Sequence, residues 1–223
     1  MALASGGSTD EIYEAVRERI LSGALSPPAP VRQDALAQSL GVSKIPLREA
    51  LVRLEQDGLL SLEKNRGFFV RPLDAGEAEE VFALRLKIEP ECVALAALNA
   101  TPEEQAAARA ALNALDCEVE AQGSRIGALN RAFHLALARP ARRPVTAQLL
   151  ERLLVLSERY VRKHLEPQGR QERAHTEHEI LLDLWTRRAE AELVRATADH
   201  IETTLADLRR QLASSTTGSS EIS

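Results

Sequence analysis

In the N-terminal third of the chain, apolar residues recur at the spacing of an α-helix. The stretch "STDEIYEAVRERILSG" keeps them on one face and opens with Ser8 and Glu11, which are spaced as a capping box. A short helix is expected around "LAQSL", followed by a turn at Gly41 and a further helix after Ser43. The apolar positions of this last helix follow the i, i+3, i+4, i+7 pattern of a helix with one buried face: Leu47, Ala50, Leu51 and Leu54.

The pattern changes after Gly58, which is expected to end that helix. "LLSLEKNRGFFV" places β-forming residues on both sides of "KNRG" and therefore predicts two short strands joined by a turn. Helices, a turn, a further helix and a β-hairpin, in this order, form a winged helix-turn-helix. We predict such a domain over residues 8–73.

From residue 74 onward the pattern is helical. "DAGEAEEVFALRLKIEPECVALAALN" predicts one long helix bent at Pro90, and the next helix is expected to begin at Thr101 and to end at Gly123. Four further helices are predicted at about 125–138, 144–164, 171–187 and 189–212. The predicted fold class is thus mainly α, with an all-α six-helix bundle over residues 74–213. The polar tail 214–223 is expected to be disordered.

Composition supports helix-on-helix packing and indicates the compartment. Aromatic residues make up only 3% of the 223 residues, so alanine and leucine must fill the core. No apolar stretch is long enough for a membrane span, and the N-terminus lacks the pattern of a secretion signal. Cys92 and Cys117 are too few for a disulfide framework, so we expect buried, reduced thiols and a cytoplasmic protein.

Charge alone does not predict a nucleic-acid partner, because residues 1–73 hold nine cations and nine anions and the whole chain has a net charge of −5. Lys44 and Arg48 nevertheless lie near the start of a helix, where the macrodipole disfavours each cation by about a few tenths of a kcal/mol. On a helical wheel both face away from the apolar stripe. Phosphates or guanine edges of DNA can offset the cost. The alternative is a solvated basic patch on a surface helix.

The stretch "LAQSLGVSKIPLREALVRLEQDGLL", followed by "NRGFFV", resembles the N-terminal domain of the GntR family of bacterial transcription regulators. Lys44 stands where that family usually has arginine, and Ile45 where it usually has threonine. Because lysine cannot fork onto guanine as arginine does, target affinity or sequence preference is expected to differ from the family norm. The resemblance implies a double-stranded DNA operator as partner and assigns DNA contact to Ser43, Lys44, Arg48, Arg66 and Gly67.

The six predicted helices after such a domain resemble the FCD-type ligand-binding domain of the FadR subfamily. Six helices are closer to its VanR-like branch than to the seven-helix FadR branch. The resemblance implies a homodimeric regulator whose operator binding responds to a small organic-acid effector in the helical bundle. We expect the protein to repress transcription and the effector to relieve that repression, since this is the commoner mode of regulation in the family.

All five histidines of the chain lie in the predicted helical domain. Asn130 and His134 share a helix face at i and i+4, and His178 and His200 lie on two later helices, so three imidazoles and an oxygen donor can converge on one transition metal. The alternative is ordinary surface or core histidines. The resemblance favours a metal site, because many members of this subfamily hold a divalent ion such as Zn, Ni or Mn through Asp-x3-His and two later histidines. His164 is expected to be a surface residue, as is His175.

Asn130 takes the place of the aspartate in that ligand set. A neutral amide leaves the full charge of a divalent ion in place, which is expected to weaken metal retention and to strengthen attraction for an anionic effector. Arg85 and Glu89 are also spaced i and i+4. By resemblance they are candidates for effector binding, and the alternative is a simple intrahelical ion pair. Trp185 is expected in the core.

Two other functions fit parts of the sequence. A metal-dependent enzyme could use the His134, His178 and His200 cluster with open coordination positions. A protein-interaction module that has lost DNA binding would explain the neutral charge of residues 1–73. Against the enzyme, no general base is placed beside the cluster, and the predicted first domain is left unexplained.

Overall fold

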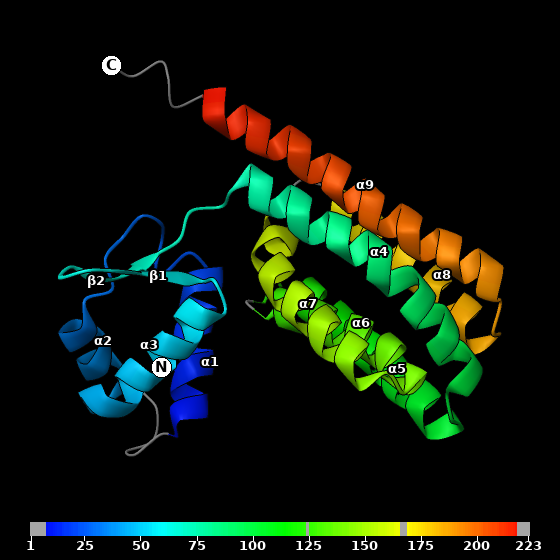
Figure 1. Cartoon of the computed structure of the whole chain (residues 1–223), viewed down its shortest axis with the longest axis horizontal. Helices are drawn as coiled ribbons and strands as arrows, with labels where there is room; N and C mark the ends of the chain where they lie inside the picture. Colours follow the sequence, from blue (N-terminus) through cyan, green and yellow to red (C-terminus); the bar gives the residue numbers. More distant parts are fainter. Residues whose placement is uncertain (1–7, 124, 166–168, 218–223) are drawn as a thin grey trace. The chain divides into compact units, whose positions relative to one another are not determined.

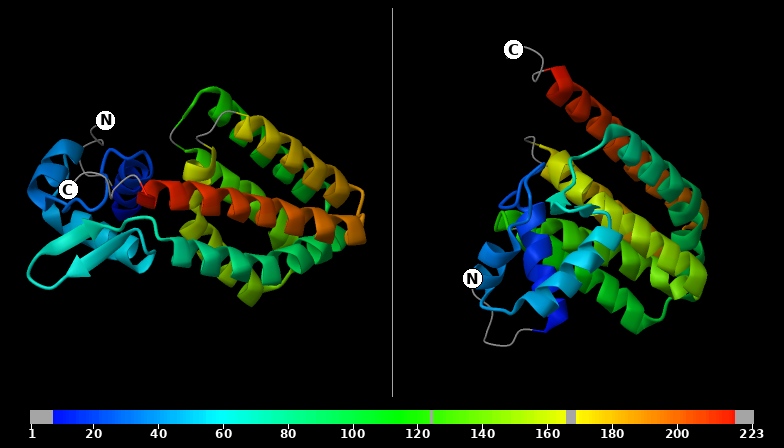
Figure 2. Two further views of the ribbon diagram at one scale, coloured as in Figure 1. Left: turned by 90° about the horizontal axis from the view of Figure 1, so that it is seen from above. Right: turned by 60° about the vertical axis from the view of Figure 1, so that its left-hand side comes forward.

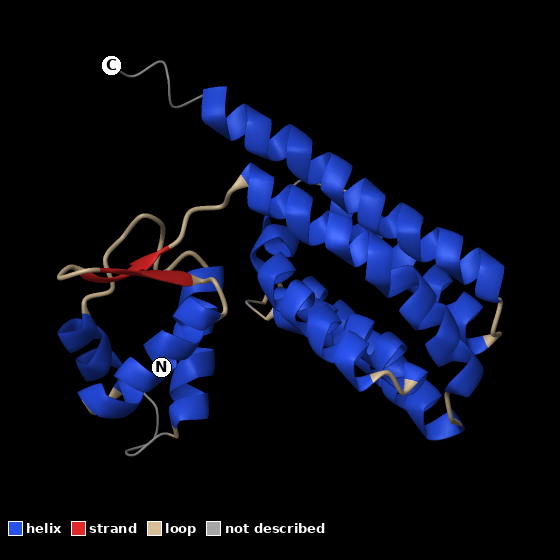
Figure 3. Ribbon diagram, in the orientation of Figure 1, coloured by secondary structure: helices blue, strands red, loops and turns tan. Residues whose placement is uncertain are grey.

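The structure is a computed structural model that describes residues 8–123, 125–165 and 169–217. The chain divides into two compact units, residues 1–72 and 73–223. Figure 3 shows that the strands of the described chain are confined to the first unit, and Figure 1 gives the labels of the elements. The first unit contains α1 (Thr9–Leu21), α2 (Gln33–Leu40), α3 (Lys44–Gln56), β1 (Leu60–Glu63) and β2 (Gly67–Val70).

Two of three local signals in the first unit act as predicted. Ser8 and Glu11 form both hydrogen bonds of a capping box at the start of α1. Gly41 adopts the left-handed conformation, with φ of +71°, and so allows the tight turn between α2 and α3. Ser43 precedes α3 at the N-cap position, but its side chain makes no capping hydrogen bond.

A single apolar core holds these helices together, and the hairpin closes one end of it. β1 and β2 pair antiparallel, with Leu60 opposite Val70 and Leu62 opposite Phe68. Phe68 is 1% exposed and packs among the buried faces of the three helices. The hairpin is therefore fixed to α3 through the core, which keeps the wing and the third helix in a constant relation.

The second unit is all helix in its described part, and the prediction of six α-helices is confirmed. They are α4 (Ala75–Asn99), α5 (Pro102–Glu120), α6 (Ile126–Ala138), α7 (Pro144–Leu165), α8 (Arg170–Thr186) and α9 (Glu190–Thr217), with a 3-10 turn, η1 (Arg139–Ala141), after α6. α4 continues through Pro90 as one helix. α4 and α9 lie side by side over much of their length (Figures 1 and 2).

The predicted tail needs a correction at its start. Residues 214–217 belong to α9, because no glycine or proline interrupts the helix before residue 218. The remaining part of the predicted disordered segment, residues 218–223, lies outside the described residues.

The core of the second unit consists mainly of alanine and leucine, as the composition predicts, and Trp185 is completely buried within it. Cys92 is buried, but Cys117 is exposed, so the expectation of two buried thiols is wrong for Cys117. Its position on α5 falls off the face that Leu112 and Leu115 bury. Among the described residues, no helix combines the length and the apolarity that a membrane crossing needs.

Candidate functional site

The outer face of α3 presents the cations that the sequence singles out. Leu47 and Leu51 are fully buried against the rest of the first unit, whereas Lys44 and Arg48 are exposed. Ser43, at the N-cap, is exposed as well. The helical wheel therefore predicted the two faces of α3 correctly.

Acidic neighbours explain why the first unit has no net charge. Lys44 Nζ lies 2.5 Å from Asp34 Oδ1 of α2, and Arg66 in the hairpin turn pairs with Glu63. The Arg66 guanidinium also lies over the Phe69 ring, 4.9 Å from its centroid. Exposed pairs of this kind contribute less than about 1 kcal/mol, so a DNA phosphate can displace the carboxylate.

The wing and α3 border a common hollow. Its lining includes Arg48 from α3 and Lys64, Asn65 and Gly67 from the hairpin. Gly67 has a φ of +91°, a conformation that a residue with a side chain adopts only under strain, so glycine is needed where the turn enters β2. The residues assigned to DNA contact thus lie on the third helix and the wing of one rigid unit.

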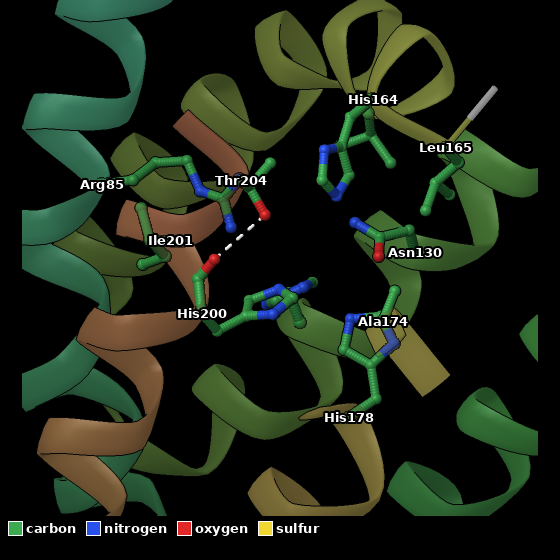
Figure 4. A pocket seen from close by; sticks show the side chains of 11 residues that line it. Arg85, Asn130, His164, Leu165, Ala174, His178, His200, Ile201 and Thr204 are labelled. Atoms are coloured by element: carbon green, nitrogen blue, oxygen red, sulfur yellow. Dashed lines mark hydrogen bonds between the residues drawn. The ribbon is translucent and has the colours of Figure 1, made fainter. Parts of the chain in front are cut away.

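Three histidines from three helices of the second unit converge in its interior. His134 on α6, His178 on α8 and His200 on α9 each offer a ring nitrogen, and these atoms all lie within 4.8 Å of one another. The ring centroids are 4.9 to 5.5 Å apart. All three side chains are at least nine-tenths buried. Figure 4 shows His178, His200 and Asn130 around the same pocket.

Two of these rings contact a carboxylate through Nδ1. His134 Nδ1 lies 2.7 Å from Glu89 Oε1, and His200 Nδ1 lies 2.7 Å from Glu177 Oε2. A carboxylate fixes the proton on Nδ1 and leaves the Nε2 lone pair available, which is the usual support of a metal-binding histidine. Nε2 of His134 and Nε2 of His178 are buried and have no hydrogen-bond partner in the described part of the chain. The donor set therefore fits a transition metal ion.

Burial disfavours the charged form of two of these histidines, His134 and His178. It lowers the pKa of His134, and the neighbouring Glu89 offsets this only in part. Burial lowers the pKa of His178 well below its ordinary value, and the other imidazoles act in the same direction. Neutral imidazole is the form that donates a lone pair to a metal, so burial favours the metal-binding form of these two rings.

A buried ion pair lies behind His134. Arg85 Nε is 2.8 Å from Glu89 Oε2, and the two side chains are 2% and 0% exposed. Burial acts to raise the pKa of Glu89, but Arg85 and His134 together hold it well below its ordinary value. Both candidate effector residues thus form the intrahelical pair. Arg85 also lines the pocket, whereas Glu89 uses one oxygen for Arg85 and the other for His134.

The pocket between the histidines is small. Its volume is about 20 Å³, and its lining includes the three histidines, Asn130, Arg85 and His164. A space of this size admits a single water-sized group. It therefore accommodates a metal ion beside the Asn130 amide, but an organic acid does not fit until the surrounding helices move.

The expectation that His164 lies on the surface is wrong. It is 4% exposed, and its Nδ1 lies 3.5 Å from the buried carboxylate of Asp207. Burial lowers the pKa of His164 to about 4. A sequence signal was present, because His164 continues the helical stripe of Leu150, Leu154 and Val161 on α7, whose members are all buried.

His175 is exposed, as expected, and lies 2.9 Å from Asp116. Together with Glu179 these residues form a second group of metal-ligating type. Glu179 is engaged by Arg109 through both carboxylate oxygens, at 2.6 and 2.8 Å. Surface ion pairs therefore account for this group.

Comparison with known protein families gives two matches along the chain. Residues 8–70 match the model described as bacterial regulatory proteins, gntR family, and residues 80–203 match the FCD domain. The two matches fall on the first unit and on the helices of the second. They cover the α3 cations and the histidine cluster, respectively.

Individual relatives agree with the family matches. The chain is 32% identical over 173 residues to the Nta operon transcriptional regulator of Aminobacter aminovorans, covering 77% of this chain and 80% of the relative. It is 29% identical to the uncharacterized HTH-type transcriptional regulator YdhC of Bacillus subtilis, but that alignment covers only 56% of each protein. The solved structure of McbR/YncC from E. coli superposes with a TM-score of 0.76 at 26% identity, covering 92% of this chain and 98% of that one.

Proposed function

Because the chain belongs to the gntR family of bacterial regulatory proteins and carries an FCD domain, we propose that this transcriptional regulator is a metal-loaded repressor controlled by an organic acid. Its families and relatives are transcriptional regulators and not enzymes, so the histidine cluster is given a binding role. We propose the metal, the effector, the repression of transcription and the homodimer.

The observation that carries the proposal is the convergence of three buried imidazoles on a space that admits one small group. His134, His178 and His200 would hold a divalent ion such as Zn, Ni or Mn, with the Asn130 carbonyl as a fourth donor. When bound, such an ion acts as a Lewis acid that anchors a carboxylate. Glu89 and Glu177 orient two of the rings.

The size of the pocket suggests how an effector acts. An acid of several atoms needs more than the 20 Å³ observed, so its binding selects an arrangement of the helices in which the pocket is wider. A ligand shifts an equilibrium only through its different affinity for two states. Effector binding thus favours the wider state of the bundle, and we propose that this state binds the operator less tightly.

On the DNA side, two copies of the first unit would read two half-sites in a homodimer. Ser43, Lys44 and Arg48 would meet the major groove, while Arg66 and Gly67 at the wing would meet the backbone or the minor groove. Lys44 and Arg66 would then leave the carboxylates of Asp34 and Glu63 and pair with DNA phosphates instead.

A thermal-shift experiment tests the metal site. The full-length protein is freed of metal with a chelator, and its melting temperature is measured with added zinc, nickel or manganese. His178→Ala removes a ligand of the cluster. His175→Ala is the matched control, because it removes an exposed histidine from the same helix. We expect metal to raise the melting temperature of the wild type and of the control but not of His178→Ala. Equal shifts in all three proteins would rule out the cluster as the binding site.

A second experiment tests effector control. Binding to a labelled duplex from the region upstream of the gene is measured by anisotropy, with zinc and a panel of small carboxylates. We expect at least one acid to release the wild-type protein and not His178→Ala. A duplex that is never bound would point instead to an interaction module without DNA binding.

A further inference from the structure

Ile45 has no packing role in the first unit. Among the described residues it is the large apolar side chain with the greatest exposure, at 74%. It lies in the first turn of α3, between Lys44 and Pro46. The helix forms without it, because the buried stripe of α3 supplies the core contacts.

The position of Ile45 on the helix is specific. Successive residues of an α-helix are about 100° apart. With that step Ile45 falls opposite the middle of the buried stripe, which consists of Leu47, Ala50, Leu51 and Leu54. Arg48 and Val52 lie about 60° and about 20° from it, on one side of the outer face. Ile45 therefore lies at the centre of the surface that α3 presents to a partner.

The neighbours of Ile45 indicate what that partner surface is. Single exposed apolar residues are common and by themselves need no explanation. Here, however, Lys44 precedes Ile45 in the chain and Arg48 lies about 60° from it around the helix, and these cations favour a polyanion over an apolar protein surface. The N-terminal residues of the second helix of a helix-turn-helix meet base edges in the major groove. The apolar group exposed there is the thymine methyl.

We propose that Ile45 contacts a thymine methyl group and makes this protein prefer thymine at one position of each half-site. The inference rests on the DNA-binding role of the first unit and adds a specificity-determining residue to it. Lys44 and Arg48 supply attraction to phosphates and guanine edges, while Ile45 supplies apolar contact that distinguishes thymine from cytosine and from uracil. Burial of one methyl group corresponds to about a four-fold change in affinity.

The test uses the full-length protein and a randomised duplex library, from which binding sequences are enriched. Each thymine of the enriched sequence is then replaced in turn by deoxyuridine, which removes only the methyl group. Dissociation constants are measured by anisotropy at one fixed salt concentration for the wild type, Ile45→Ala and Ile45→Val. Val52→Ala is the matched control, since it truncates another exposed apolar residue of the same helix.

We expect one thymine per half-site at which deoxyuridine weakens wild-type binding about four-fold. Ile45→Ala should lose this sensitivity, whereas Ile45→Val and Val52→Ala should keep most of it. An enriched sequence without such a position, or a methyl effect that persists in Ile45→Ala, overturns the inference and leaves DNA binding intact. A library that yields no enriched sequence overturns both the inference and the DNA-binding role.

Discussion

Replacing Glu89 by leucine is expected to destabilise the helical unit by about 3–5 kcal/mol. The magnitude follows from burial, because Arg85 is 2% exposed and Glu89 is 0% exposed. Leucine is close to glutamate in size, so the substitution removes a charge and leaves no large cavity. Arg85 then remains in the interior without its counter-charge, and this uncompensated charge is the source of the loss.

Urea unfolding, followed through the fluorescence of Trp185, measures the effect. Trp185 is the single tryptophan of the chain and is fully buried in the helical unit, so its signal reports that unit. With a urea dependence of about 2 kcal/mol per molar, the expected shift of the midpoint is about 2 M. A chelator is present throughout, so that metal binding does not contribute to stability.

Two further variants separate the possible causes of the stability loss in Glu89→Leu. Arg85→Met combined with Glu89→Leu removes both charges and should recover most of the lost stability. It does not restore the carboxylate behind His134, so metal affinity should remain about 10- to 100-fold below that of the wild type. Glu179→Gln breaks an exposed pair with Arg109 and should cost less than about 1 kcal/mol. A single Glu89→Leu variant no less stable than this control would refute the reasoning.

Four other outcomes are expected. Asn130→Asp should bind zinc more tightly in a competition titration and respond more weakly to carboxylates, because it adds a negative charge to the site. Alanine at Lys44 and Arg48 should reduce the slope of log affinity against log salt by about 1 for each residue that contacts a phosphate, measured by anisotropy with an enriched duplex. The pKa of His164 is about 4 in the folded protein against 6.5 unfolded, so the unfolded chain takes up its proton first as the pH falls below 7. At pH 5 this should cost about 2 kcal/mol, a loss that His164→Gln lacks in urea titrations. Dicarboxylates should release operator DNA at lower concentration than monocarboxylates of equal length in the same anisotropy assay.

The outer face of α3 could be predicted from the sequence because both faces belong to one helix. Once Leu47 and Leu51 are assigned to the core, the 3.6-residue period places Lys44 and Arg48 outside. The partner of Lys44 could not be predicted in the same way. Asp34 lies on another helix, and only the packing of α2 against α3 brings the two side chains together.

The histidine cluster, likewise, could be predicted from the sequence only in part. The residues His134, His178 and His200 could be selected from spacing together with the family resemblance. Glu177 could not, because it lies off the inner face of α8 and reaches His200 only across the contact with α9. His164 was missed because its type suggested a surface position, while the apolar stripe on its own helix indicated burial.

In the proposed site, the charge balance around the cluster would favour a dianionic effector. Each carboxylate that supports a histidine also has an arginine beside it: Glu89 pairs with Arg85, and Glu177 lies 3.4 Å from Arg173. The Glu89–Arg85 pair is neutral as a unit, and burial lowers the pKa of His134 and of His178. Asn130 adds no charge where an aspartate would supply one. A divalent ion would therefore bring two positive charges into a buried space that does not compensate them, which is costly in a low-dielectric interior. In the proposed site a monocarboxylate would cancel one of these charges and a dicarboxylate both, so the second carboxylate would add affinity through the electrostatics of the site itself.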